Sequence, residues 1–148
     1  MRRAVVGATI LVALAGGLAD AQHKIPPIPE TARAPVVLPS GLTYIDIKGG
    51  TGVPATKGRM VRIAFIGWVT KSQLMFDFRD PPNPLALHLG RPDPNIVKGL
   101  DEGVVGMRVG GTRRVVIPPN LAYGSNPPSS AIRANETLLF EISLLAVQ

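Results

Sequence analysis

The sequence predicts an α+β domain that is mostly β, with an antiparallel sheet curled around one short helix. Several short segments alternate apolar and polar residues, as strands with one buried face do. The chain of 148 residues contains 16 glycines and 15 prolines, which indicates many turns and few long helices. Strand-like segments do not alternate with helical ones, so nothing favours a parallel sheet. The length suits one compact domain.

The N-terminus has the pattern of an export signal. Arg2 and Arg3 precede an uncharged apolar stretch, and Ala19-Asp20-Ala21 then supplies the small-x-small pattern of a cleavage site. The sequence therefore predicts a signal peptide over residues 1–21, cleavage between Ala21 and Gln22, and a periplasmic or secreted protein. The apolar stretch is shorter than the about 20 residues that a bilayer span needs, although an uncleaved membrane anchor is the alternative.

Residues 22–39 contain five prolines and are predicted to form a proline-rich linker. Proline removes backbone donors and fixes φ, so this segment is expected to join neither a helix nor a central strand. It is expected to be extended and semi-stiff, with the option of packing on the domain surface. The folded domain is then predicted over residues 40–148.

Six segments of that domain have the pattern of strands. They are 42–48, 60–66, 74–78, 85–89, 112–117 and 137–147. In the second segment, Val61, Ile63 and Phe65 fall on one face. The last segment is long and apolar, which predicts a central place in the sheet.

One stretch has a helical period. Ile96, Leu100, Val104 and Met107 are spaced by four, four and three residues, which predicts a short helix with one apolar face. Asp93 or Asn95 is expected to cap its start, and Gly106 and the Gly110-Gly111 pair to end it. Asp101 and Glu102 are expected on its solvated face.

Composition excludes several kinds of site. The chain has no cysteine, so it can form no disulfide, thiolate nucleophile or cysteine-based zinc site. Its two histidines, His23 and His88, are too few for a histidine-rich metal site, and His88 is expected to be an ordinary strand histidine. Asp101 and Glu102 are adjacent in the helix and do not face each other, which disfavours a carboxylate pair. No metal or cofactor is expected.

The formal net charge is +6, but the basic residues are spread along the chain. A nucleic-acid-binding face would gather them and interleave aromatic residues for stacking. The charge pattern therefore predicts a moderately basic surface and no nucleic acid as partner.

Four motifs remain, and together they carry a resemblance. They are Phe76-Asp77 after a hairpin at Gly67, Pro84–Gly90, Ile96–Gly110 and Ile117–Ile142, the last including Leu121-Ala122-Tyr123-Gly124. Their order and spacing over residues 40–148 resemble the FKBP family of peptidyl-prolyl isomerases, in an exported bacterial form. The resemblance implies a five- to six-stranded antiparallel half-barrel wrapped on a short helix.

The resemblance also implies an apolar pocket between the helix and the concave face of the sheet. Its implied catalytic residues are Asp77, Tyr123, Phe76 and Phe140. Its implied substrate-binding residues are Phe65, Leu85, Ile96, Val97, Leu100 and Ile132. Tyr123 is expected to donate its hydroxyl to a substrate carbonyl and the backbone N–H of Val97 to anchor the carbonyl after proline, while Asp77 orients or polarises the twisting amide.

Several residues depart from the family pattern. Phe65 stands where tyrosine is usual, Leu100 where tryptophan is common and Leu85 where phenylalanine is usual. The stretch Arg91–Asn95 is longer than usual, and Arg133-Ala134 replaces a Pro-Pro pair. The pocket stays apolar, and macrolide binding is expected to be weakened.

Three functions follow as hypotheses. The first is a peptidyl-prolyl cis/trans isomerase (EC 5.2.1.8) that helps exported proteins fold by desolvating a twisted prolyl amide. The second is a chaperone-like module of the same fold, with little or no activity, that holds proline-containing segments. The third is an unrelated secreted β-rich structural protein, which leaves the four motifs unexplained. The partners expected are proline-containing segments of folding proteins, and a monomer is expected.

Overall fold

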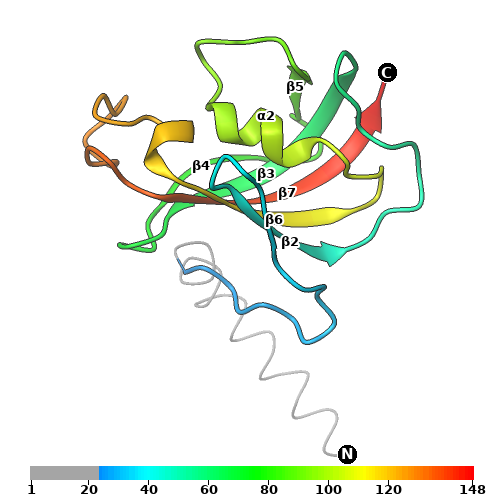
Figure 1. The fold of residues 1–148 in the computed structure, drawn as a ribbon, viewed down its shortest axis with the longest axis horizontal. Helices are drawn as coiled ribbons and strands as arrows, with labels where there is room; N and C mark the ends of the chain where they lie inside the picture. The colour runs from blue at the N-terminus through cyan, green and yellow to red at the C-terminus, as the bar shows by residue number, and fades with distance from the viewer. Residues whose placement is uncertain (1–23) are drawn as a thin grey trace, which may run out of the picture.

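One antiparallel sheet and one short helix make up the part of the chain that the structure describes, residues 24–148 of a computed structural model (Figure 1). The predicted signal peptide lies outside the described residues. The strands are β1 (Val36–Val37), β2 (Thr43–Lys48), β3 (Met60–Val69), β4 (Met75–Arg79), β5 (Leu85–His88), β6 (Thr112–Ile117) and β7 (Leu138–Val147). The helix is α2 (Lys98–Val104), and a 3₁₀ turn, η1, covers Pro119–Leu121. The predicted fold class is confirmed.

The strand order is β1-β2-β6-β7-β3-β4, and β5 pairs with part of β3. Every pairing is antiparallel. The last strand, β7, pairs with β3 on one side and β6 on the other, as its long apolar sequence predicts. The sheet has seven strands, more than the expected five to six, because Val36 and Val37 of the proline-rich segment pair with β2.

The core lies between the concave face of the sheet and α2. Val61, Ile63 and Phe65 point into it from β3, as their alternation predicts. The helix contributes a face of small and apolar residues, including Gly99 and Gly103. A Cβ at Gly99 would lie 2.4 Å from Cγ2 of Ile117, and one at Gly103 would lie 2.9 Å from Cγ1 of Val115. The two glycines therefore allow α2 to lie directly on β6.

The helix is shorter than its sequence period indicates, and the predicted N-terminal caps are wrong, whereas Gly106 ends it as predicted. It begins at Lys98, with Val97 at the N-cap position and no side-chain cap. Asp93 Oδ1 accepts the N–H of Asn95 instead, which closes a local turn. Gly106 follows the helix with a φ of +90°, a conformation that glycine adopts without strain. Met107 is buried in the core just beyond the helix.

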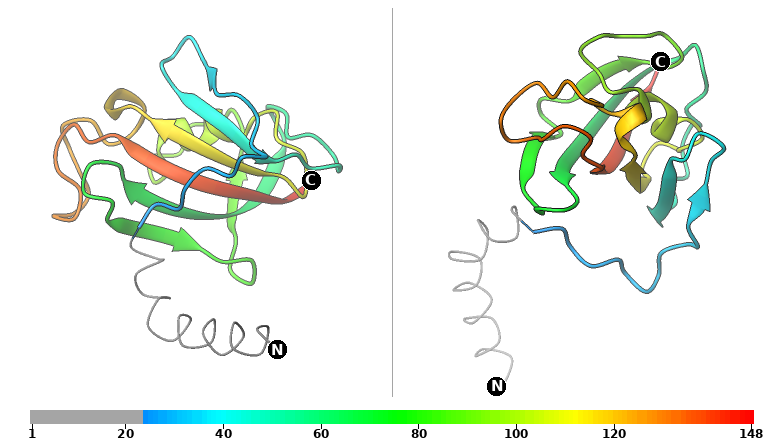
Figure 2. Two further views of the ribbon diagram at one scale, coloured as in Figure 1. Left: turned by 90° about the horizontal axis from the view of Figure 1, so that it is seen from below. Right: turned by 60° about the vertical axis from the view of Figure 1, so that its left-hand side comes forward.

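The proline-rich segment lies against the sheet on the side opposite α2 (Figure 2). Arg114 is buried, and its Nη1 donates to the carbonyl of Pro26 at 2.7 Å. The N–H of Arg33 donates to the carbonyl of Asp46 at 3.0 Å. Residues 24–37 therefore follow the surface of the domain, while the domain boundary at Ser40 stays a prediction.

Candidate functional site

The structure brings together the residues that the sequence singles out, although they come from seven separate places in the chain. Nine of the ten belong to one cluster around the hydrophobic core. The buried members are Phe65, Val97, Leu100, Ile132 and Phe140. The half-buried members are Phe76, Leu85, Ile96 and Tyr123. The tenth residue, Asp77, is exposed at the edge of the cluster.

Three phenylalanine rings form the centre of this cluster. Phe140 lies 5.4 Å from Phe65 and 5.6 Å from Phe76, measured between ring centroids, and the second pair is edge-to-face at 89°. Both arrangements are favourable for aromatic quadrupoles. Together the rings make a rigid apolar wall whose inner members are buried and whose outer member, Phe76, is half-exposed.

Gly67 makes room for two of these rings, a role that the sequence analysis missed. It lies opposite Phe140 on β7 and opposite Asp77 on β4. A Cβ on Gly67 would be 3.0 Å from ring atoms of both Phe140 and Phe76. The absence of a side chain therefore lets both rings lie across strand β3.

Asp77 and Tyr123 supply the polar groups at the rim. Asp77 Oδ1 accepts the N–H of Phe78 at 2.8 Å, which fixes the carboxylate close to the backbone of β4. Burial, and secondly the negative charge of Asp77, raise the pKa of Tyr123 above its ordinary value of 10.0. The two side chains thus interact electrostatically, and the phenol stays protonated and able to donate at neutral pH.

The turn that carries Tyr123 is closed by backbone hydrogen bonds. The N–H groups of Ala122 and Gly124 both donate to the carbonyl of Pro119, at 3.0 and 2.9 Å. The N–H of Asn135 donates to the carbonyl of Gly124 at 2.7 Å, which joins the two ends of the following loop. This closure holds Tyr123 in place and returns Ile132, which is buried, to the same cluster.

Val97 stands where the chain enters α2. Its carbonyl accepts the N–H of Leu100 at 3.0 Å and so begins the first turn. Among residues 24–148, no acceptor pairs with the N–H of Val97 itself. The first N–H groups of a helix lack partners inside the helix, so this group is available to an acceptor from outside.

A buried arginine, Arg113, holds the other end of α2, and the sequence analysis did not single it out. Its Nη1 donates to the carbonyls of Gly103 and Val105, both at 3.1 Å. Its Nε donates to Oδ1 of Asp46 at 2.7 Å, and its guanidinium lies 3.9 Å from the centroid of the Tyr44 ring. A cation at the C-terminal carbonyls also suits the helix dipole. Arg113 therefore ties α2 to β2 and β6.

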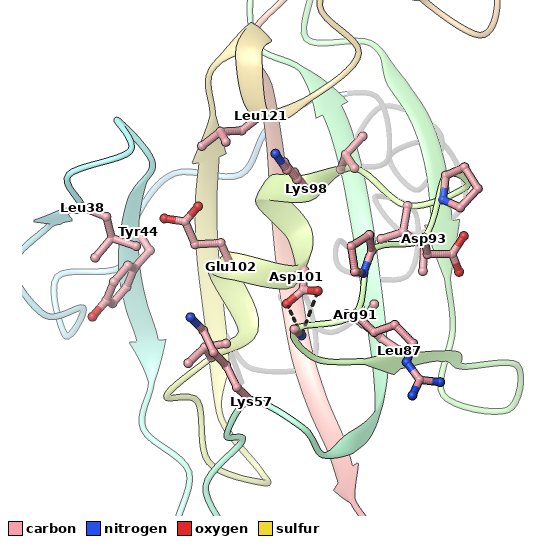
Figure 3. Close-up of a pocket in the computed structure, with 16 residues that line it drawn as sticks. Leu38, Tyr44, Lys57, Leu87, Arg91, Asp93, Lys98, Asp101, Glu102 and Leu121 are labelled. Atoms are coloured by element: carbon pink, nitrogen blue, oxygen red, sulfur yellow. Dashed lines mark hydrogen bonds between the residues drawn. The ribbon is translucent and has the colours of Figure 1, made fainter.

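A cavity of about 840 Å³ lies beside this cluster, over the outward face of α2 (Figure 3). It shares only Ile96 and Val97 with the predicted pocket. Asp101 and Glu102 line it and are half-buried, so the helix face that was expected to be solvated forms part of the wall of this cavity. The length of the Arg91–Asn95 stretch, noted in the sequence, was the available signal, because that stretch forms one side of the cavity.

Residues 24–148 lack two further features. In that range, no three His, Cys, Asp or Glu side chains gather in a way that could hold a metal ion. Within the same range, no helix has the length and apolar character needed to cross a bilayer.

Comparisons with known proteins agree with the geometry. Residues 52–145 match the model of the family described as FKBP-type peptidyl-prolyl cis-trans isomerase. A protein named FK506-binding protein 4 from Mycosarcoma maydis is 40% identical over 111 residues, which cover 75% of this chain and 28% of that protein. The chain thus spans little more than a quarter of that relative's length.

A shorter bacterial protein matches along nearly its full length. The FK506-binding protein of Neisseria meningitidis is 35% identical over 107 residues, which cover 72% of this chain and 96% of that protein. Among solved structures, the N-terminal domain of FKBP42 from Arabidopsis thaliana superposes with a TM-score of 0.74 at 25% identity. That match covers 84% of this chain and 98% of the domain.

Proposed function

Because the chain belongs to the FKBP-type peptidyl-prolyl cis-trans isomerase family, we propose that it catalyses cis/trans isomerisation of the peptide bond before proline. The observation that carries this proposal is the apolar cluster of Phe65, Phe76 and Phe140, with Asp77 and Tyr123 interacting at its rim. The substrates are proline-containing segments of folding proteins.

The chemistry needs neither a nucleophile nor a metal. The barrier to rotation is about 20 kcal/mol, because the planar amide has partial double-bond character. At the twisted transition state this resonance is lost and the amide becomes less dipolar. An apolar surface that excludes water therefore favours the twisted amide over the planar one.

The polar groups have separate roles in this proposal. Tyr123 donates its hydroxyl to a substrate carbonyl, which its raised pKa supports by keeping the phenol protonated. The N–H of Val97 anchors the carbonyl after proline, in keeping with its lack of a partner in the described chain. Asp77 orients or polarises the twisting amide from the edge of β4.

The apolar residues divide by burial. Phe65, Leu100 and Phe140 form the floor, because they are nearly inaccessible, whereas Phe76, Leu85 and Ile96 form walls that a prolyl ring can reach. Val97 and Ile132 close the floor beside the helix and the long loop. The prolyl ring gains by leaving water for this surface, at about 25 cal/mol per Å² of apolar area.

An assay on Ala-Leu-Pro-Phe tetrapeptides tests the isomerase. The double variant Asp77→Asn/Tyr123→Phe removes one charged and one neutral hydrogen-bonding group while keeping both side-chain shapes. We expect kcat/KM to fall about fiftyfold, roughly 2–3 kcal/mol. NMR exchange spectroscopy measures the rate without a coupling protease.

The matched control is Asp80→Asn/Tyr44→Phe, which makes the same two chemical changes at residues that the proposal does not assign to the prolyl pocket. Asp80 is exposed in the turn after β4, and the ring of Tyr44 stays beneath Arg113. Its kcat/KM is expected to equal that of the unaltered protein. Equal rates for the two double variants, or no acceleration by the unaltered protein, would contradict the proposal.

A binding module without turnover is the second candidate. Phe65 and Leu100 offer no donor to the pocket floor, so Asp77 and Tyr123 carry all the polar contacts that the proposal assigns to side chains. Suppressed aggregation of a denatured client with unchanged exchange of the tetrapeptide would favour this function.

We further propose that the protein acts after export and as a monomer. The pattern Ala19-Asp20-Ala21 supports export, and protein sequencing of the processed form is expected to begin at Gln22. A product that retains Met1 would contradict cleavage. Since two of the relatives are named for binding FK506, we expect that compound to bind here, more weakly because Phe65 and Leu100 replace tyrosine and tryptophan. Competition in the exchange assay measures its affinity.

A further inference from the structure

The cavity of about 840 Å³ has Ile96 and Val97 in its lining, and both also belong to the cluster that holds the phenylalanine rings. Helix α2 crosses its middle, the Gly90–Pro94 stretch borders one side, and Leu38 and Tyr44 border the other (Figure 3). We call this space the outer cavity. It is large enough for one or two amino-acid side chains, well beyond the volume of a few waters.

The walls of the outer cavity are largely apolar. Leu38, Leu87, Val105 and Leu121 line it, together with the ring of Tyr44. The Tyr44 ring is already held on one face by the guanidinium of Arg113. A preformed apolar cavity of this kind takes an apolar group that would otherwise stay in water.

The acidic residues at the outer cavity are already engaged. Both carboxylate oxygens of Asp101 accept the N–H of Gly90 at 3.1 Å. Glu102 Oε1 accepts the hydroxyl of Ser40 at 2.5 Å, and Asp93 Oδ1 accepts the N–H of Asn95 at 2.9 Å. These bonds tie Gly90 and Ser40 to the helix, while each carboxylate keeps its negative charge.

The basic residues at the outer cavity are not engaged. Lys57, Arg91 and Lys98 line it and are exposed. Among residues 24–148, none of these three side chains forms an ion pair or a hydrogen bond. The three basic and three acidic side chains of the lining balance in formal charge, but among the described residues only the basic ones lack a partner. The cavity therefore offers unpaired cationic donors beside an apolar wall, and this combination fits an apolar group that is accompanied by a carboxylate.

The outer cavity adjoins the proposed prolyl pocket. Ile96 and Val97 line it and also belong to the set proposed to bind substrate. An extended chain advances about 3.3 Å per residue, so a peptide with its proline beside Val97 passes into the outer cavity within a few residues.

We propose that the outer cavity is a second subsite for the same client chain, which receives a large apolar side chain and a neighbouring carboxylate a few residues from the proline. This inference rests on the proposed function. It makes acidic, aromatic-containing flanks the preferred context of the proline, a selectivity that short tetrapeptides do not reveal.

Binding of three fluorescent peptides, each with a central Ala-Leu-Pro-Phe, tests the subsite. On both sides of this centre, the first peptide carries glutamate and phenylalanine, the second carries glutamate and glycine, and the third carries only glycine and serine. We expect the first to bind about tenfold more tightly than the third, as measured by anisotropy, and the second to fall between them. Equal affinities for the first and third peptides would overturn the proposal.

Two charge variants locate the effect. Lys57→Glu/Arg91→Glu reverses charges at the outer cavity, and Lys24→Glu/Lys71→Glu makes the same net change at exposed positions that do not line it. The first variant is expected to abolish the tenfold preference and the second to keep it. Both are expected to turn over the bare tetrapeptide normally. Equal loss of the preference in both variants would overturn the subsite.

The readouts separate this inference from the proposed function. Failure of tetrapeptide exchange with a retained flank preference would count against the isomerase and leave the subsite standing. Normal tetrapeptide exchange without a flank preference would support the isomerase and overturn the subsite. Sedimentation of the unaltered protein tests whether a second copy of the chain occupies the cavity. Self-association that Lys57→Glu/Arg91→Glu removes would assign the cavity to that second copy and overturn the proposal.

Discussion

At the scale of single residues, Asp77 and Tyr123 are the two polar side chains of an otherwise apolar cluster. A half-buried phenol with a neighbouring carboxylate loses its proton less readily, because both desolvation and the negative charge disfavour the phenolate. Burial is the larger of these causes. Tyr123 is therefore poised as a hydrogen-bond donor over the whole physiological pH range.

Asp77→Asn is expected to lower the pKa of Tyr123 toward 10.0 without reaching it, because the charge is removed while burial, the larger cause, remains. In the unaltered protein, Tyr123 therefore loses its proton, and with it the hydrogen-bond donor, only as the pH rises above 10.0. In the variant this loss begins at a lower pH than in the unaltered protein. A carbon-13 NMR titration of the Tyr123 ring measures both values.

The control for this titration is Glu30→Gln, which removes an exposed carboxylate that does not act on Tyr123. It should leave the titration of Tyr123 in place. An unchanged Tyr123 pKa in Asp77→Asn would mean that the two side chains do not interact at the rim.

At the scale of elements, helix α2 positions the site, because Val97 precedes it and Leu100 lies within it. Its close approach to β6 depends on Gly99 and Gly103, spaced by one helical turn. Its C-terminal end is fixed by Arg113, whose buried charge is paired with Asp46. Removing one partner of a buried ion pair lowers the free energy of unfolding far more than removing an exposed ion pair does, so the C-terminal end of α2 is strongly held.

Gly99→Ala is expected to lower the free energy of unfolding by about 1–3 kcal/mol, as overpacking of a core does. The new Cβ would meet Cγ2 of Ile117 at 2.4 Å, and the helix must move away from the sheet to accept it. Val97 and Leu100 move with the helix, so tetrapeptide turnover should fall as well. Urea unfolding and the exchange assay measure the two effects.

Gly49→Ala provides the comparison. Its Cβ would meet only the end of the Arg33 side chain, at 3.3 Å, and that flexible group can move. Stability and turnover should change little. A Gly99→Ala protein as stable as Gly49→Ala would show that α2 does not need its close contact with β6.

At the scale of the whole molecule, the sheet is covered on two sides. Helix α2 covers the concave face, and the proline-rich segment follows the opposite face (Figures 1 and 2). Arg114 connects this segment to the sheet, since it binds the carbonyl of Pro26 and the carboxylate of Glu141 on β7. The segment is thus held by a charged hydrogen bond as well as by the pairing of β1 with β2.

Arg114→Lys is expected to lower the free energy of unfolding by about 1.5–3 kcal/mol, the range for a hydrogen bond to a charged group. A lysine ammonium keeps the charge but lacks the planar fork that reaches Pro26 and Glu141 together. Limited proteolysis should also cut within residues 24–35 sooner. Urea unfolding and mass spectrometry of the fragments measure these changes.

Arg133→Lys makes the same exchange at an exposed position and should alter neither quantity. Unchanged proteolysis in Arg114→Lys would show that β1 pairing alone retains the segment.

The sequence was sufficient for strands β2 to β7 and for the central place of β7. These follow from local alternation, which forces Val61, Ile63 and Phe65 onto one face whatever their neighbours are. Six predicted strands appear within a few residues of their expected ends. The site residues were located through a resemblance in their motifs, and their roles remain predictions.

Tertiary structure decided what depends on contacts between distant segments. The period of α2 could not show that Val97 is its N-cap, because Asp93 closes a local turn instead. The closeness of Gly67 to Phe76 and Phe140 and the anchoring of α2 by Arg113 are likewise invisible in the chain. The outer cavity belongs to this class too, since its walls come from parts of the sequence that meet only when folded. A local sequence pattern determines on which face of its strand or helix a residue lies. Only the packing of the folded chain determines which residues that face contacts.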